Sequence, residues 1–399
     1  RKYYRFVYDY KLSEVIEKRN LSRERVFELS RKGLISFEIK KNVKFYSLSE
    51  IDSALNENSK KAEQYYKINK SKKTDIKAIE LFSGCGGLAL GLKNAGVNAE
   101  MLVEIDKDSC DTLSLNFLNS NIICDDIAKI DFTSYKGKID IVAGGFPCQA
   151  FSYAGKSKGF EDTRGTLFFD FARSVKEVNP KVAIGENVRG LINHDKGRTL
   201  STMINTLEDL GYNVQFKLLL AQYFNVPQKR ERVFIVATRK DLPNTYQYPK
   251  ELDYFVPLEV ALKDCPPSEG QKYPKRKKEI MDMVPQGGYW KDLPIEVQKE
   301  YMKGSFYLGG GKTGTARRLS MKEPSLTLVT SPAQGQTERC HPLETRPLTI
   351  RESARIQTFP DNWTFSGSLA SQYKQIGNAV PVNLGFHVGR SVVSYLNSI

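Results

Sequence analysis

Histidine, tryptophan and cysteine are scarce in this chain of 399 residues, which holds three His, two Trp and six Cys. No two cysteines form a CxxC pair, and the histidines at positions 194, 341 and 387 are isolated from one another in the sequence. These are not the ligand spacings of a zinc site, so we expect no metal. Because the sequence shows neither a disulfide framework nor a signal peptide, we expect the cysteines to be reduced thiols.

Long apolar runs are also missing. No stretch approaches the roughly 18 apolar residues that a membrane-spanning helix needs, so we expect no membrane partner and a cytoplasmic, nucleoid-associated protein. Positive charge is what the chain has in excess, with 60 Lys and Arg against 46 Asp and Glu and a net charge of +14. Such charge favours a polyanionic partner, most commonly nucleic acid, although a merely basic soluble protein would carry it too.

Much of this charge lies in the first 75 residues, which hold 19 Lys and Arg against 11 Asp and Glu. The pattern predicts short helices over 12–18 and 22–32, the second with Ser22 as its N-cap and Gly33 at its end. A hairpin over 34–39 and 43–47 and a helix over 48–55 are expected to follow. This order is that of a winged helix-turn-helix module over residues 1–57, or of a small appendage that packs on the main domain. The lysine-rich residues 58–75 predict a linker or a charged helix.

From residue 77 the chain alternates apolar strands with amphipathic helices, which is typical of an α/β fold with a parallel sheet covered on both faces. We expect the final two strands to pair as an antiparallel hairpin at the sheet edge, because no helix separates them. The strands are expected over 77–82, 100–105, 121–124, 139–144, 181–185, 213–220 and 233–238, and the helices over 88–95, 108–117, 167–178 and 198–210.

This rhythm is lost over residues 240–345, which are rich in Pro, Gly and Lys and have long irregular stretches. We interpret this region as belonging to a second, smaller domain. Regular pattern returns near residue 346 and ends in a helix over about 383–396.

A glycine-rich turn, Phe-Ser-Gly-Cys-Gly-Gly at 82–87, follows the first strand. Its glycines allow a tight turn close to a ligand, and the helix after it offers free N–H groups. Glu104 and Asp106 follow the second strand, where an acid can bind ribose hydroxyls, and Asp126 after the third strand suits an adenine amino group. Together they predict a nucleoside crevice at the carboxyl ends of the strands. The turn by itself fits a dinucleotide, a flavin, S-adenosylmethionine or no ligand.

Cys148 directly follows the fourth strand, in Gly-Gly-Phe-Pro-Cys-Gln at 144–149. A thiolate there needs neighbouring positive charge or N–H donors to lower its pKa, and Arg230 and Arg232 are candidate sources of charge. Glu186 ends the fifth strand, where a carboxyl group is expected near the fourth. The alternatives are a buried structural thiol for Cys148 and a helix-initiating acid for Glu186.

Five motifs carry a resemblance to a known family. The chain resembles the bacterial DNA (cytosine-5)-methyltransferases of restriction–modification systems over about residues 77–260 and 345–399. The motifs are the turn at 82–87, Gly-Phe-Pro-Cys-Gln at 145–149, Glu-Asn-Val at 186–188, Gln-Lys-Arg-Glu-Arg at 228–232 and Gln-Ile-Gly-Asn-Ala-Val-Pro at 375–381. The resemblance implies a Rossmann-like S-adenosylmethionine-dependent catalytic domain over 76–260, a target-recognition domain over 261–345 and a hinge with a C-terminal return over 346–399.

The resemblance also implies roles for single residues. Cys148 would attack carbon 6 of a cytosine flipped out of double-stranded DNA, and carbon 5 would receive the methyl group. Glu186, with a raised pKa, would hydrogen-bond N3 and the amino group, and Arg232 would hold O2. Arg230 would lie near Cys148 and the target phosphate, while the base that removes the carbon-5 proton is not assigned. The implied cofactor contacts are Phe82, Gly84, Gly86, Glu104, Ile105, Asp126, Ile127, Pro147, Leu167, Asn378 and Ala379.

Position 105 departs from the family, which often has an aromatic residue there. Ile105 predicts a weaker apolar contact with the adenine in place of ring stacking.

Contacts with DNA are expected from two regions. The loop after Cys148 has the small residues and charges of a mobile loop that closes over the flipped base, or else is an ordinary surface loop. Residues 240–345 show no strong basic patch, with 16 Lys and Arg against 14 Asp and Glu, but offer Arg and Gln for guanine and adenine edges. Many of these are expected to serve as phosphate or structural contacts. The residues expected on DNA are Ser152, Ala154, Lys156, Arg164, Arg317 and Arg339.

These inferences predict a monomer that methylates a short specific sequence, protects host DNA from a cognate restriction endonuclease and regulates its own operon through the N-terminal module.

An RNA cytosine-5 methyltransferase is one rival, but such enzymes typically take their nucleophile from the fifth-strand motif, which here has no Cys. A tRNA-methylating branch carries a Cys-Phe-Thr signature that is absent here. The other rival is a transcriptional regulator. If the module only regulates, deleting residues 1–70 should abolish binding to upstream DNA and leave methylation intact. The target sequence is not readable.

Overall fold

The computed structural model describes residues 7–147, 166–310 and 312–399. Its contacts divide the chain into two compact units. The first unit consists of residues 1–67, 227–229 and 253–356, and the second unit of residues 68–226, 230–252 and 357–399. The five-part division by function that the sequence suggested stays a prediction.

The second unit is built on a seven-stranded sheet with the order β6-β5-β4-β7-β8-β11-β9. Its first five strands pair in parallel, whereas β11 is antiparallel to both β8 and the edge strand β9. This confirms the expected parallel sheet and edge hairpin. The strands are β4 (Lys77–Leu81), β5 (Asn98–Glu104), β6 (Asn121–Cys124), β7 (Ile141–Gly144), β8 (Val182–Val188), β9 (Tyr212–Leu220) and β11 (Glu231–Arg239).

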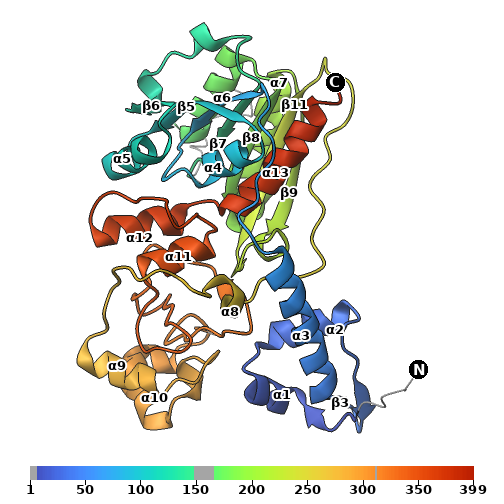
Figure 1. Ribbon diagram of the computed structural model, residues 1–399, viewed down its shortest axis with the longest axis vertical. Coiled ribbons are helices and arrows are strands. Elements are labelled where there is room, and N and C mark those ends of the chain that lie inside the picture. The colour runs from blue at the N-terminus through green and yellow to red at the C-terminus, as the bar shows by residue number, and fades with distance from the viewer. Residues whose placement is uncertain (1–6, 148–165, 311) are drawn as a thin grey trace. The chain divides into compact units, whose positions relative to one another are not determined.

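Helices cover both faces of this sheet (Figure 1). Side chains of alternate residues point to opposite faces of a strand, so Ile79 and Leu81 pack against α6 and α7, and Ala78 against α4 and α13. The chain order reverses at β4, whose neighbours are β5 and β7, and a ligand crevice is expected at such a switch point. The helices are α4 (Gly87–Asn94), α5 (Lys107–Asn116), α6 (Leu167–Val178), α7 (Arg198–Asp209), α12 (Leu369–Asn378) and α13 (Val382–Leu396).

Helices α4 and α13 approach each other closely at Gly91. A Cβ atom added there would lie 2.6 Å from the carbonyl carbon of Gly385, well inside van der Waals contact. We expect Gly91→Ala to lower the free energy of unfolding by about 1–3 kcal/mol, because the two helix backbones must move apart in a dense interior. Urea unfolding measures this change. Gly304→Ala is the control, since an added Cβ there meets no atom within 4 Å, and it should cause no loss of stability. An unchanged urea midpoint for Gly91→Ala would contradict the close approach.

The N-terminal part of the first unit has its elements in the expected order. The Ser22 hydroxyl caps the second helix, as predicted, by accepting the N–H of Arg25 at 3.2 Å. Lys41 and Asn42 form the hairpin turn, and both have positive φ, as a two-residue turn matched to the strand twist requires. The elements are β1 (Tyr10–Lys11), α1 (Leu12–Arg19), α2 (Arg23–Arg31), β2 (Glu38–Lys40), β3 (Val43–Tyr46) and α3 (Leu48–Tyr65).

Helix α3 continues past its expected end at Leu55 to Tyr65. The lysine-rich segment is therefore helical as far as Tyr65, which agrees with the charged helix, one of its two predicted alternatives.

The rest of the first unit is more regular than its composition suggested. Two helices, α9 (Lys275–Asp282) and α10 (Ile295–Met302), lie in the region expected to be irregular. Each helix is directly preceded by a proline, Pro274 or Pro294. Proline suits the start of a helix because its φ is already helical. The unit also holds α8 (Leu258–Ala261), α11 (Ile350–Ile356) and a parallel pair formed by β10 (Gln228–Lys229) and β12 (Ser325–Leu326).

Within residues 7–147, 166–310 and 312–399, no helix is both long and apolar enough to cross a membrane. Within the same ranges, no three His, Cys, Asp or Glu side chains gather as a metal site requires.

Candidate active site

A cavity of about 860 Å³ lies at the carboxyl ends of β4, β5, β7 and β8, at the switch point of the sheet. Its volume is in the range of small-molecule sites. It brings together most of the predicted cofactor and catalytic residues. Those that line it are Phe82, Gly84, Glu104, Ile105, Asp126, Ile127, Pro147, Leu167, Glu186, Arg230, Arg232, Asn378 and Ala379.

Gly86 is the one described cofactor residue that does not line the cavity. It is the N-cap of α4 with a φ of 88°, and a Cβ there would lie 2.8 Å from the Phe117 ring. The positive φ and the close Phe117 ring therefore explain why this position is glycine.

Cys148 and the loop residues Ser152, Ala154, Lys156 and Arg164 lie outside the described residues. Pro147, which directly precedes Cys148 in the chain, lines the cavity.

Glu104 holds the glycine-rich turn against the end of β5. Its Oε2 accepts the N–H of Gly84 at 2.7 Å, and its Oε1 accepts the N–H groups of Ile105 and Asp106 at 2.8 and 2.9 Å. A carboxylate has about four lone-pair sites, so one acceptor site remains for a ribose hydroxyl. Phe82 and Gly84 have φ values of 55° and 53°, which shows how tightly the turn bends toward the cavity.

The predicted adenine side is more open. Asp126 caps a short turn by accepting the N–H of Ala128 through Oδ1 at 3.0 Å, which leaves Oδ2 for a ligand amino group. Ile105 is 68% exposed, and its apolar contact with the adenine stays a prediction.

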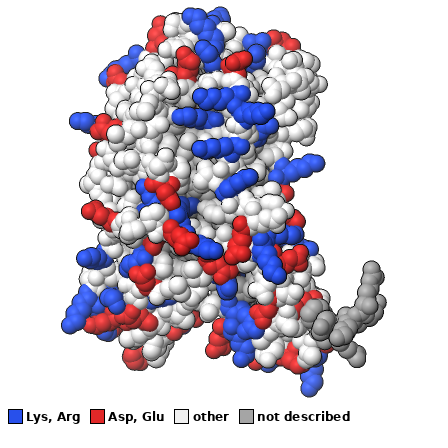
Figure 2. Space-filling model, viewed as in Figure 1, with Lys and Arg blue, Asp and Glu red and all other residues white. Residues whose placement is uncertain are grey.

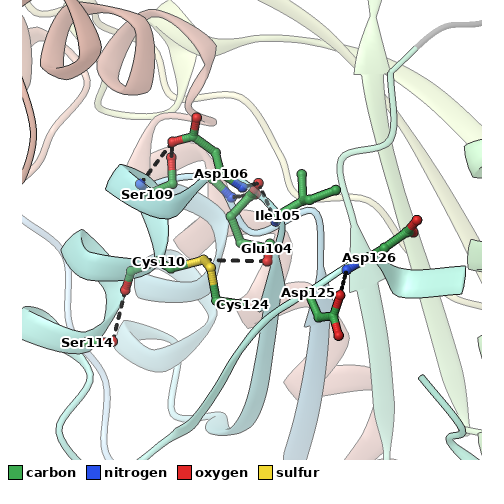
Figure 3. Close-up of a disulfide and its surroundings, with 10 residues drawn as sticks. Glu104, Ile105, Asp106, Ser109, Cys110, Ser114, Cys124, Asp125 and Asp126 are labelled. Carbon is green, nitrogen blue, oxygen red and sulfur yellow. Dashed lines mark hydrogen bonds between the residues drawn. A yellow bond between two sulfur atoms is a disulfide. The ribbon is translucent and has the colours of Figure 1, made fainter. Parts of the chain in front are cut away.

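A disulfide joins Cys110 in α5 to Cys124 at the end of β6 (Figure 3), which corrects the expectation that all cysteines are free thiols. The fold brings the Cα atoms of these residues to 5.8 Å, within the usual range for a disulfide, although they lie in separate elements without a CxxC spacing. Sulfur in a disulfide has no proton to donate. The 3.4 Å approach of Cys110 Sγ to the Glu104 carbonyl oxygen, dashed in Figure 3, is therefore a simple contact. The disulfide ties α5, which follows Glu104 in the chain, to the end of β6, which precedes Asp126.

Glu80, in the middle of β4, is a cavity residue that sequence reasoning missed. It is buried, and its Oε2 has no hydrogen-bond partner among the described residues. Burial, and to a lesser extent the charges of Glu104 and Glu186, raise its pKa well above the ordinary value. A charged residue inside an otherwise apolar strand was the available signal. A buried carboxyl that faces a ligand cavity is suited to a cationic group of the ligand.

We expect Glu80→Gln to weaken binding of S-adenosylmethionine, whose ammonium and sulfonium groups are cationic, by about tenfold. Burial raises the pKa of Glu80, so below that pKa a cation that pairs with the carboxylate binds with release of a proton. Affinity should then rise with pH up to that pKa and level off above it. Calorimetry across pH measures this dependence, which Glu80→Gln should flatten. The same pH dependence in both proteins would exclude Glu80 as the cation's partner.

Glu186 and Arg232 form a buried pair beside the loop that leads to Cys148. Glu186 Oε1 lies 2.8 Å from Arg232 Nε. Burial raises the pKa of Glu186 even though Arg232 and Arg230 act to lower it, and burial lowers the pKa of Arg232. A Cβ at Gly145 would lie 2.9 Å from Glu186 Oε2, so glycine there lets the carboxyl group approach the loop. The pair therefore combines an acid prepared to hold a proton with a fixed cation.

Arg230 and Asn187 brace the site. The guanidinium of Arg230 is almost completely buried and donates from Nη2 to the carbonyl oxygen of Gly377 at 2.9 Å. Burial lowers its pKa to about 9. This places Arg230 in the cavity lining and ties it to the C-terminal return, while its role toward Cys148 and a phosphate stays a prediction. The Asn187 amide donates to the carbonyl oxygen of Phe146 at 2.8 Å and so fixes the loop before Cys148, a role that the Glu-Asn-Val motif did not reveal.

Arg317 and Arg339, the described candidates for DNA contact, lie in the first unit. Arg339 donates from Nε and Nη2 to the carbonyl oxygen of Thr327 at 2.9 and 2.7 Å, and burial lowers its pKa to about 10. The Arg317 guanidinium lies 5.7 Å from the centre of the Tyr289 ring. Both have structural contacts, so their use in reading DNA stays a prediction.

The parallel sheet, the glycine-rich turn, the acid Glu104 at the end of β5 and the buried acid–arginine pair are typical of the class of α/β enzymes that act through a nucleoside cofactor. A family model described as C-5 cytosine-specific DNA methylase matches residues 76–394. The chain belongs to this family, which confirms the resemblance found in the sequence, and its activity is that of a Type II cytosine-5 DNA methyltransferase.

Similar proteins support this assignment. The chain is 53% identical to the Type II methyltransferase M.Eco47II of Escherichia coli, over 98% of this chain and 97% of that protein. It is 58% identical to M.PspPI of Psychrobacter sp. (strain TA137), over 80% and 79%. A crystal structure of a Spodoptera frugiperda DNMT2 mutant matches with a TM-score of 0.57 at 17% identity, over 81% of this chain and 98% of that one. At that identity the likeness shows the fold alone.

Proposed function

We propose that this protein transfers the methyl group of S-adenosylmethionine to carbon 5 of one cytosine in a short, specific sequence of double-stranded DNA. The observation that carries this proposal is the position of the Glu186–Arg232 pair. It lies in the wall of a nucleoside-sized cavity whose lining runs up to Pro147, the residue before Cys148.

The residues of the cavity suit S-adenosylmethionine. Glu104 keeps one acceptor site for the ribose, Asp126 keeps an oxygen for the adenine amino group, and Glu80 offers a cation its Oε2, which has no hydrogen-bond partner among the described residues. When bound, S-adenosylmethionine supplies an electrophilic methyl group on a sulfonium. Its second product is S-adenosylhomocysteine.

The protein side of the reaction follows from the chemistry of cytosine. The Cys148 thiolate forms a bond to carbon 6, and the ring electrons move toward N3 and O2. Protonated Glu186 donates to N3, and Arg232 stabilises the charge at O2. Carbon 5 is now nucleophilic and takes the methyl group. A base then removes the carbon-5 proton, the bond from sulfur to carbon 6 breaks, N3 returns its proton to Glu186, and the thiolate is restored.

The substrate base must leave the duplex to reach this site, at a cost of a few kcal/mol. We propose that the loop of Ser152, Ala154, Lys156 and Arg164 closes over the flipped base. Figure 2 shows Lys and Arg side chains gathered over one face of the second unit. Lys70 and Lys73 add to the effect of burial in lowering the pKa of Lys93, and such uncompensated repulsion between cations is relieved when DNA phosphates approach.

We also propose that the protein is a cytoplasmic monomer whose methylation protects host DNA from a cognate restriction endonuclease. The names of the Type II relatives support this role. Regulation of its own operon by the N-terminal module is the alternative use of that module, and the contacts of α2 described below bear on it.

Expression in a host without cytosine-5 methylation tests the proposed function. Converted plasmid DNA, sequenced after bisulfite treatment, should show protected cytosines within one short motif. If no cytosine is protected although the protein is folded and binds S-adenosylmethionine, DNA is not the substrate and RNA should be tested instead.

A further inference from the structure

The hydrophobic core of the N-terminal module is completed by a residue from far along the chain. Phe255 is 3% exposed and belongs to the same apolar cluster as Val15, Val26, Leu29 and Ile51 of helices α1 to α3. The guanidinium of Arg25 in α2 lies 3.6 Å from the centre of the Phe255 ring. Without Phe255 this small core would lose a large aromatic side chain.

Asn58 fastens the same segment to α3. Its side-chain amide donates to the carbonyl oxygen of Phe255, and its Oδ1 accepts the N–H of Phe255, both at 3.0 Å. Ser59 donates to Glu259 at 2.9 Å one residue further along the helix. A buried asparagine whose donor and acceptor are both satisfied by one backbone residue specifies a single arrangement.

Glu323 forms a second joint, at the N-terminus of α2. It is 5% exposed, and its two carboxylate oxygens accept the N–H of Ser22 and the Nζ of Lys229, each at 2.6 Å. Lys229 Nζ also donates to the Ser22 hydroxyl at 3.1 Å. The charges of Lys229 and Arg25 help to hold the pKa of Glu323 below its ordinary value against the effect of burial, so the carboxylate stays ionised.

These contacts occupy part of the end of α2 that a DNA-binding helix uses. A recognition helix presents its N-terminal residues to the DNA, but here Arg25 in the first turn is buried against Phe255, and the half-buried Ser22 at the N-cap is hydrogen-bonded to Glu323. The helix is used to join parts of the first unit to one another.

We propose that the N-terminal module is a fixed part of the target-recognition unit, and that Glu323 is a positioning residue that anchors Lys229 and with it the arginine motif of the active site. Lys229 is held by Glu323 and also pairs with β12, and the next residue in the chain is Arg230. DNA bound by the first unit can thus set the start of the strand that carries Arg230 and Arg232. This inference rests on the proposed function.

Substitutions that keep the shape of the joint test it. In the full chain, Glu323→Gln and Lys229→Met should each lower the single-turnover rate of methyl transfer by about 10- to 100-fold, because small misplacement of catalytic groups has effects of this size. Binding of S-adenosylmethionine should not change. Lys229→Arg, which keeps the charge, should recover most of the rate. Lys61→Met is the matched control, since Lys61 pairs with Asp253 at 3.0 Å in an exposed position, and it should keep the wild-type rate.

The double variant separates positioning from stability. Each single variant leaves a buried polar or charged group without its partner and should lower the melting temperature. Lys229→Met combined with Glu323→Gln should melt above both single variants but methylate no faster than they do. Recovery of rate together with melting temperature would show that the joint serves stability alone and would overturn the positioning role.

Hydrogen exchange tests the fixed module in the full chain. Phe255→Ala should speed amide exchange in residues 12–65 and in residues 253–262 together. Retained protection in residues 12–65 would show that the module folds by itself, and would favour the regulator instead. Wild-type enzyme assayed in parallel separates failure of the proposed function from failure of this inference. No methylation by wild type would contradict the proposed function. Wild-type rates in both Glu323→Gln and Lys229→Met would contradict only the inference.

Discussion

Replacement of Cys148 by alanine should abolish methylation, with a loss of at least about 10⁴-fold in the rate of the chemical step. Carbon 5 of cytosine is a poor nucleophile, and without a thiolate bonded to carbon 6 the ring cannot deliver electrons to the methyl group. The loss should therefore appear in the rate of transfer and not in cofactor affinity. Conversion sequencing of plasmid DNA from cells that express the variant measures the result.

Cys265→Ala is the control for this substitution. Cys265 is a partly exposed cysteine in the first unit and has no role in the proposed reaction, so its variant should protect the same motif as wild type. Calorimetry with S-adenosylmethionine should show that the Cys148→Ala cavity is intact. Protected cytosines in DNA from Cys148→Ala cells would remove Cys148 as the nucleophile.

Glu186→Gln should lower kcat by about 10²- to 10³-fold, the usual effect of removing one group that stabilises developing charge. The amide keeps the size of the carboxyl group but cannot give N3 a proton. Burial raises the pKa of Glu186 above its ordinary value, so the protonated form is present below the raised pKa and is lost as pH rises through it. The Cys148 thiolate, by contrast, forms as pH rises. The rate should therefore first rise and then fall with increasing pH, which gives a bell-shaped profile.

The shape of this profile is the decisive measurement. Glu186→Gln should lose the fall at high pH and keep the rise that comes from Cys148. Glu231→Gln is the matched control, because Glu231 lies between the two motif arginines but pairs with Arg189 at 2.8 Å in an exposed position, and it should keep both limbs. A high-pH fall that survives in Glu186→Gln must arise from another group.

Local patterns predicted the elements of the second unit well, because each local signal agreed with the tertiary structure. The alternation of apolar residues gave the strands and helices of the sheet to within a few residues, and Ser22 was recognised as a cap from its type and place alone. Glu104 and Glu186 were found because each lies at or near the carboxyl end of a parallel strand, and these ends share one edge of the sheet.

Other features had little or no local signal. Cys110 and Cys124 approach each other only after α5 has packed beside β6. Glu80 had a weak signal, its charge within a largely apolar strand, but only the fold shows that it lines the ligand cavity. Helices α9 and α10 were not expected in a region rich in Pro, Gly and Lys, although a proline directly precedes each of them.

The sequence by itself determined the reaction class and the order of strands and helices, because ordered motifs and apolar periodicity are properties of short segments. It also predicted Cys148 as the nucleophile. The tertiary structure decided what the N-terminal module is attached to. Phe255 and Glu323 contact it, through Arg25, Asn58 and Ser22, across sequence separations of 197 to 301 residues. Buried contacts of this kind depend on packing between distant segments, so no window of the sequence contains both partners.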